Sequence, residues 1–465
     1  MRVSKQMSRT KWYAVALIAI ISVAAVSVWW FLVPKTPIQP GIELRIITRH
    51  DPTLQLKIEQ AFLASEYATN NSITSIAWTQ PNMMFWPQTI PIYLPDIALG
   101  GGPTLFNELY DLGLISVLDS PEILAAIARV NDTIAGVDAK GYNAGNECIW
   151  VGSAISSFGF TINKPWLDTR GLPYPTHWEN LTGDEFGQFL PTTPTIAMGN
   201  SPGTTSNTRI YEIILQKFGW VEGWEVLTRM AGNSRIELGS TETQAQVENG
   251  VTGVAMSIDF YGFSTALRNP DCEYRIPVNG SIINPDPIAI CTTATHPDAA
   301  EAFVDFILTP EGQSIWLDEA INRLPILEEA FQTPVGQTRD DLYLFYNNSI
   351  NNIGIDFSDP LALSYEYSLM YYFEAVLTNA QSDLVSCWDK LVDAYRNALI
   401  SQGQFESFAA QMAAPMTWDT ETFTEAYAIS INDQMGSSAS FRATMQAEWT
   451  AAAEAQYNAV EALIP

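Results

Sequence analysis

The stretch Leu94-Pro-Asp-Ile-Ala-Leu-Gly-Gly-Gly-Pro-Thr104 decides the kind of fold, because an apolar run ends there in three glycines. The apolar residues of 90–99 predict a strand, and the spacing of apolar residues over 105–114 predicts a helix. The glycines between them allow another molecule to approach the backbone closely. A strand, a glycine turn and a helix in succession are typical of α/β proteins.

The same unit returns about 100 residues later, where Gly199-Asn-Ser-Pro-Gly-Thr-Thr-Ser206 separates a predicted strand at 195–198 from a predicted helix at 207–217. Further predicted strands lie at 42–48, 155–162, 251–258 and 287–291, and further helices at 53–65 and 299–308. Strands that alternate with helices favour α/β layers over a sandwich or a bundle.

Beyond residue 327 the pattern changes. Strand-like runs become rare, and apolar residues near the C-terminus recur close to the helical period. We expect helices in this region, which either pack on the α/β part or mediate assembly.

The N-terminus predicts a membrane anchor. Residues 13–33 (YAVALIAIISVAAVSVWWFLV) contain no charge and are long enough to span a bilayer. Basic residues precede this segment, so the positive-inside rule places the N-terminus in the cytoplasm and the body outside the cell. A cleaved signal peptide is the alternative, although its apolar core is normally shorter. Three prolines follow in 34–40 and predict an extended spacer.

The composition excludes several classes of function. The 465 residues carry 23 Lys and Arg against 51 Asp and Glu, a formal net charge of -28 at pH 7. Such an acidic surface repels nucleic-acid backbones, so we expect no nucleic-acid partner. The four cysteines lack zinc-ligand spacing, although outside the cell they would allow up to two disulfides. We expect neither a metal nor a cofactor.

Residues Gly199-Asn-Ser-Pro-Gly203 match the G-x-S-x-G pattern of serine hydrolases. In such enzymes the backbone N–H after the serine stabilises an oxyanion, and Pro202 has no N–H. We therefore interpret this loop as a binding loop, since hydroxyls and free N–H groups at a helix start suit anions and polar oxygens. Ordinary helix capping is also consistent with this loop and with the loop at 100–104. A cell-surface serine hydrolase using Ser201 and a structural envelope glycoprotein are the alternative functions.

Several further segments, taken in the order in which they occur along the chain, indicate a relationship to a known family. They are Arg45-Ile-Ile-Thr-Arg-His-Asp51, Leu94-Pro-Asp-Ile-Ala-Leu-Gly-Gly-Gly102, Phe106-Asn-Glu-Leu-Tyr-Asp-Leu-Gly-Leu114, Trp178-Glu-Asn-Leu181, Gly219-Trp-Val-Glu-Gly-Trp224, Gly250-Val-Thr-Gly-Val254, Ile258-Asp-Phe-Tyr261 and His296-Pro-Asp-Ala-Ala-Glu-Ala-Phe-Val-Asp-Phe-Ile-Leu-Thr-Pro-Glu-Gly-Gln313. Together they resemble the extracellular solute-binding proteins of ABC transporters, in the ferric-iron, phosphosugar and thiamine-type group.

The resemblance implies an α/β, two-lobed, periplasmic-binding-protein-like type II fold with crossovers near 150–158 and 286–292. The predicted domains are an N-terminal transmembrane helix (1–33), a Pro-rich spacer (34–41), lobe 1 (42–152 and 291–327), lobe 2 (153–290) and a C-terminal helical appendage (328–465). The implied function is non-catalytic. A receptor on the cell membrane delivers a small polar or anionic solute to the membrane subunits of an ABC permease.

We expect the solute between the lobes, because ligands in open α/β sheets bind beyond the carboxyl ends of the strands. The predicted ligand-binding residues are Gly100, Gly101, Gly102, Thr104, Ser156, Ser157, Ser201, Gly203, Thr204, Thr205, Asp259, Tyr261 and His50. Ser156 and Ser157 are placed near the hinge by the implied crossover. Arg49 either pairs with an anion or lies solvated on the surface.

His50 and Tyr261 match two places that ferric-iron members of the group use. However, Phe260 stands where a second tyrosine is used, and glycines occupy the region of the carboxylate ligand. Ferric ion prefers hard anionic oxygens, so the sequence favours a polar or phosphorylated organic solute over iron. His50 is then also consistent with a capping or hydrogen-bonding role.

Overall fold

The computed structural model describes residues 41–81, 83–351 and 354–465. The predicted transmembrane segment and nearly all of the spacer lie outside these residues. Within the described ranges, no helix combines the length and the apolar character that crossing a bilayer requires.

The strands are β1 (Ile42–Thr48), β2 (Ile73–Thr79), β3 (Ile97–Leu99), β4 (Thr133–Ile134), β5 (Val137–Asp138), β6 (Lys140–Tyr142), β7 (Cys148–Asn163), β8 (Ile196–Gly199), β9 (Ser234–Glu237), β10 (Val254–Ile258), β11 (Cys272–Arg275), β12 (Ile283–Ile290), β13 (Leu324–Pro325), β14 (Thr417–Trp418) and β15 (Glu421–Thr422). The α-helices are α2 (Pro52–Leu63), α3 (Glu66–Asn70), α4 (Trp86–Tyr93), α5 (Pro103–Asp111), α6 (Pro121–Ile127), α7 (Lys164–Asp168), α8 (Asp184–Gly187), α9 (Thr205–Phe218), α10 (Trp220–Gly232), α11 (Ser240–Glu248), α12 (Asp259–Arg268), α13 (Pro297–Ile307), α14 (Pro310–Ser314), α15 (Asp340–Ile350), α16 (Asp359–Phe373), α17 (Gln381–Arg396), α18 (Gln402–Ala413), α19 (Glu425–Ser437) and α20 (Ala439–Glu461).

The predicted alternation of strands and helices is confirmed, with one correction. The strand expected over 90–99 is limited to β3, because residues up to Tyr93 belong to α4 (Trp86–Tyr93). Pro87 in the first turn of α4 suits a helix start, since the first helical N–H groups have no partner within the helix, whereas Pro91 lies inside the helix. The cysteines also differ from what the sequence allowed, since Cys148, Cys272, Cys291 and Cys387 are all buried and unpaired.

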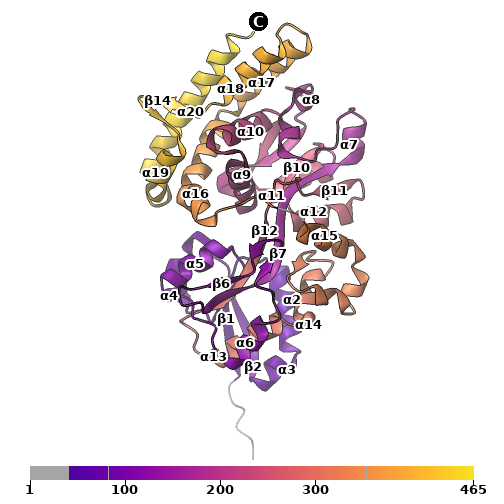
Figure 1. Cartoon of the computed structure of the whole chain (residues 1–465), viewed down its shortest axis with the longest axis vertical. Helices are drawn as coiled ribbons and strands as arrows, with labels where there is room; N and C mark the ends of the chain where they lie inside the picture. The colour runs from indigo at the N-terminus through magenta and orange to yellow at the C-terminus, as the bar shows by residue number, and fades with distance from the viewer. Residues whose placement is uncertain (1–40, 82, 352–353) are drawn as a thin grey trace, which may run out of the picture. The chain divides into compact units, whose positions relative to one another are not determined.

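Strand β7 joins two α/β lobes (Figure 1). Its first part pairs with β12, whereas its residues from Phe158 onward pair with β10 and β11. The strand path runs β2-β1-β3-β12-β7-β10-β8-β9, with parallel pairs at β1–β3, β10–β8 and β8–β9. We call the part around β1–β3 the first lobe and the part around β8–β10 the second lobe. The predicted crossovers overlap β7 and β12.

Among the described residues from 340 onward, the chain forms α15–α20 joined by loops, and its only strands are those of the short β14–β15 hairpin. Helix α16 lies against α9, and α17 and α18 lie against α10 of the second lobe, with α19 and α20 packed on α16 and α17 (Figure 1). Helix α15 lies beside α12, where Phe345 stacks on Phe263. Tyr211 of α9 stacks on Phe373 of α16 with ring centroids 4.3 Å apart, and Trp388 of α17 donates to Asn233 after α10 at 2.6 Å. Of the two roles expected for this region, the structure shows packing on the α/β part.

Candidate solute-binding cleft

A cavity of about 700 Å³ lies between the lobes, where several strands end. The first lobe contributes the turn after β1, the residues after β2, and Ile321 and Arg323. The second lobe contributes the segments after β8, β9 and β10, at 203–206, 238–242 and 260–261. This is the position expected for a ligand site in an open α/β fold.

The floor of the cavity is a buried charge cluster built on Asp286 of β12, which is fully buried. One oxygen of Asp286 accepts from Arg49 at 2.7 Å, and the other accepts from Arg323. Burial raises the pKa of Asp286, but the two guanidinium groups outweigh burial and hold it below its ordinary value. Asp286 is therefore ionised at neutral pH, and the cluster keeps one excess positive charge.

His50 belongs to the same cluster. Its Nδ1 lies 3.0 Å from Arg323 Nη1, and its ring packs edge-on against Trp316. Burial and the charge of Arg323 hold the pKa of His50 well below its ordinary value. The imidazole is therefore neutral, and because Nδ1 accepts from Arg323, its proton lies on Nε2.

The second lobe presents helix N-termini to the cavity. Helix α9 begins after Thr204, whose hydroxyl accepts from Asn207 N–H and lies 2.5 Å from the Ser240 hydroxyl. Helix α11 begins at Ser240, and Thr205 and Ser206 line the cavity at the start of α9. Unpaired N–H groups and the helix dipole make such starts favourable for anions.

Asp259, at the start of α12, faces inward rather than into the cavity. Its carboxyl accepts from the N–H groups of Ser157 and Phe260, each at 2.7 Å. Burial raises the pKa of Asp259 to about 7, although Arg323 and the two N–H groups lower it. Asp259 therefore ties the start of α12 to the middle of β7.

The predicted site residues divide into three groups. The large cavity is lined by His50, Gly203, Thr204, Thr205 and Tyr261. A smaller adjoining cavity is lined by Gly101, Gly102 and Ser156. Neither cavity is lined by Gly100, Thr104, Ser157, Ser201 or Asp259. Ser201 is fully buried and its hydroxyl bonds to Thr208, so it is not placed as a nucleophile.

The sequence interpretation missed two parts of the cleft. Arg323 gave no signal because it stands alone before the two-residue strand β13. The segment 238–242 after β9 has the same strand, glycine and serine pattern as the loop at 199–206. It was overlooked because β9 (Ser-Arg-Ile-Glu) has no apolar run. In the described part of the chain, no three His, Cys, Asp or Glu side chains gather as a metal site.

Two α/β lobes around a polar interlobe cavity define a solute-binding protein rather than an enzyme. The chain belongs to the bacterial extracellular solute-binding protein family, whose profile matches residues 93–348. Such proteins work outside the cytoplasm and deliver small molecules to ABC permeases.

Individual relatives agree with this assignment. The phosphoglycerate transport regulatory protein PgtC of Salmonella typhimurium is 28% identical over 242 residues, which are 51% of this chain and 55% of PgtC. The chain thus spans about half the length of this curated relative. The spermidine/putrescine substrate-binding protein PotD of Streptococcus pneumoniae aligns with a TM-score of 0.53 at 15% identity, over 72% of this chain and 99% of PotD. An ABC-transporter substrate-binding protein of Agrobacterium tumefaciens aligns with a TM-score of 0.51 at 15% identity, over 64% and 82%. At these identities the structures show the fold alone.

Proposed function

We propose that the protein binds a small anionic solute, such as a phosphate monoester, in the interlobe cavity and delivers it to an ABC permease. One observation carries this proposal. Arg49 and Arg323 both line the cavity, and they share a single carboxylate partner, Asp286, so the cluster presents one excess positive charge to the cavity. A charge held in a largely buried site without full compensation is costly, so an anionic solute with several acceptor oxygens compensates for it.

The charges around the cavity indicate that particular groups attract the solute, and not the net charge of the cavity lining. Asp51 and Glu242 also line the cavity, so its lining carries no large net charge. The attraction comes from the guanidinium groups and the helix starts, which act over short distances, while distant surface charge is screened beyond about 8 Å at physiological salt. The name of the curated relative PgtC, a phosphoglycerate transport regulator, supports a phosphorylated solute.

Calorimetric titration of glycerol 3-phosphate and inorganic phosphate, with glycerol as the uncharged comparison, tests the proposal. We expect both phosphates to bind and glycerol not to bind. Arg49→Met should weaken phosphate binding about 10- to 100-fold, because it removes a charged hydrogen-bond donor worth about 1.5–3 kcal/mol. Arg268→Met is the matched control, since Arg268 is an exposed arginine of the second lobe paired with Glu248. Equal binding of glycerol, or unchanged affinity in Arg49→Met, contradicts the proposal.

We further propose the predicted domain limits and a retained anchor at 13–33, with the body outside the cell. The uncharged length of this segment and the basic residues before it support the anchor. Intact mass of the membrane-extracted protein tests it. A product beginning near residue 28–36 contradicts a retained anchor and indicates a cleaved signal peptide.

A further inference from the structure

The smaller cavity extends the solute cavity toward the C-terminal helices. It measures about 90 Å³ and shares Arg49, Met83, Thr205 and Ser206 with the large cavity. Its lining includes Gly101 and Gly102 from the first lobe and Glu366 from α16. The C-terminal region therefore forms part of the wall around the space where the solute is held.

Two cations, Arg49 and Arg209, and two carboxyl groups, Glu212 and Glu366, line this extension. Arg209 of α9 pairs with Glu212 at 3.0 Å and with Asp359 of α16 at 2.9 Å. Glu212 is only 2% exposed, and just one of its oxygens meets Arg209. Within the described ranges, the other oxygen of Glu212 and the whole Glu366 carboxyl have no hydrogen-bond partner. Because these oxygens line the cavity and have no partner among the described residues, they are available to accept from a donor group on a solute.

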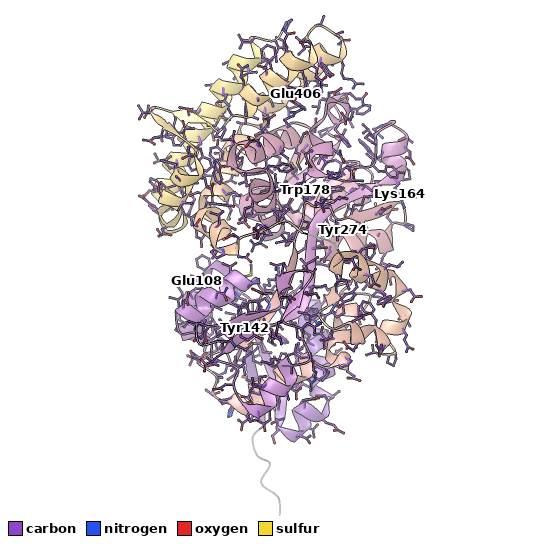
Figure 2. The ribbon with its side chains drawn as sticks, viewed as in Figure 1. Glu108, Tyr142, Lys164, Trp178, Tyr274 and Glu406 are labelled. Atoms are coloured by element: carbon purple, nitrogen blue, oxygen red, sulfur yellow. The ribbon has the colours of Figure 1, made fainter. Side chains whose placement is uncertain are left out.

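Contacts between helices across the cleft hold the residues around the smaller cavity together. Helix α16 contacts α9 of the second lobe and α5 of the first lobe, and Figure 2 labels Glu108 on α5. A Cβ on Gly102 would lie 3.6 Å from Arg209 Nη2, so the first lobe approaches Arg209 closely. Residues from both lobes and from α16 thus meet around one small space.

The two glutamates keep an acceptor oxygen in either protonation state, because a protonated carboxyl still accepts at its carbonyl oxygen. Burial raises the pKa of Glu212 to about 8, although Arg209 lowers it, while Glu366 and Asp359 raise it further. Burial also raises the pKa of Glu366, and Glu108 and Asp359 add to this effect while Arg209 opposes it. Arg49 serves the anionic end of the solute, and Arg209 already pairs with Glu212 and Asp359, so a second anionic group would face Glu366 without a further cation, which is unfavourable.

We propose that Glu212 and Glu366 form a donor-binding subsite that recognises a hydroxyl or ammonium group on the solute, opposite the anionic end held at Arg49 and α9. This inference rests on the proposed function and narrows it. The solute is an anion at one end and a hydrogen-bond donor at the other. Glu366 then determines specificity, and α16 of the C-terminal region takes part in recognition.

Titration of the full-length protein with four phosphates tests the subsite. Glycerol 3-phosphate ends in hydroxyls, phosphoethanolamine ends in an ammonium group, n-propyl phosphate has no donor at that end, and 3-phosphoglycerate carries a second anion. We expect glycerol 3-phosphate or phosphoethanolamine to bind at least 10-fold more tightly than n-propyl phosphate and 3-phosphoglycerate. Whichever of the two binds more tightly identifies the donor group.

Glu366→Ala should reduce this preference to less than 3-fold while the affinity for n-propyl phosphate changes by less than 2-fold. Glu366→Gln, which keeps the size and an acceptor oxygen, should retain part of the preference for hydroxyls. Glu448→Gln, at an exposed position of α20, is the matched control. A preference unchanged in Glu366→Ala, or an equal loss for all four phosphates, overturns the subsite alone. Failure of every phosphate to bind the wild-type protein overturns the proposed function and the subsite together.

Discussion

Asp259 shows how a single buried carboxyl links the stability of the cleft to pH. It is 1% exposed and holds the start of α12 against β7 through Ser157. Its pKa of about 7 in the folded protein lies above the value of about 3.9 in an unfolded chain. Because the folded protein favours the protonated form of Asp259, this group stabilises the folded protein fully below pH 4. The stabilisation is lost as pH rises toward 7.

Asp259→Asn should therefore gain stability relative to the wild type as pH rises from 4.5 to 7. The difference in free energy of unfolding between the two proteins should change by at most about 1.4 kcal/mol per pH unit, because the folded and unfolded states of the wild type differ by at most one bound proton. Urea denaturation of both proteins at several pH values measures this difference. Asp271→Asn, at an exposed position of the second lobe, controls for the general loss of a carboxylate. A stability difference that stays constant over this range contradicts the assigned role of burial.

At the scale of the element, the corner between β3 and α5 depends on Gly100. Gly100 has φ +79°, and a Cβ on it would lie 2.4 Å from His50 Nε2. The glycine thus lets the corner close over His50, which in turn contacts Arg323. The role that the structure shows for Gly100 is support of the cavity floor.

Gly100→Ala should lower the free energy of unfolding by about 1 kcal/mol for the backbone conformation and about 1–3 kcal/mol more for the clash. Gly113→Ala is the matched control at the other end of α5, since Gly113 has φ +71° and no heavy atom within 4 Å of the added Cβ. Denaturant unfolding of both variants compares their losses in free energy of unfolding. In a His50→Ala background, the loss caused by Gly100→Ala should fall to the loss caused by Gly113→Ala. Equal losses for the two variants in the wild-type background would show that His50 does not constrain this corner.

At the scale of the whole molecule, the second lobe and the C-terminal helices share one hydrophobic core. Trp388 of α17 is fully buried within it, and its indole packs against Gly232 at the end of α10. The core of the first lobe, around Trp86 and Phe106, is separate. We therefore expect the second lobe to unfold together with the C-terminal helices.

Trp388→Ala should destabilise this shared unit by about 3–5 kcal/mol, because it leaves a large cavity in the core. Hydrogen exchange should show lost protection in both α10 and α17, while β1 and α2 keep theirs. Trp418→Ala is the comparison, since the Trp418 ring contacts Tyr427 and Trp449 within the C-terminal region. Lost protection confined to α17–α20 in Trp388→Ala would mean that the C-terminal region is an independent unit.

The parts of the cleft that could be predicted from the sequence are those marked by a pattern of neighbouring residues. The loops at 100–104 and 199–206 follow apolar runs and precede helical periodicity, so both were found. The same pattern at 238–242 was missed because β9 lies at the end of the strand path and carries Arg235 and Glu237. An edge strand of this kind has little apolar surface to bury, so its sequence does not show the usual alternation.

The sequence by itself determined the α/β alternation, the helical C-terminal region and the glycine and hydroxyl turns, because periodicity and turn chemistry are properties of neighbouring residues. Only the tertiary structure decided which turns face one another, and that Arg323 meets His50 across 273 residues and Asp286 across 37. It also decided that Glu366 of α16 reaches the wall of the cavity. The physical reason is that electrostatic pairing and burial depend on distance in space, which local sequence patterns do not specify.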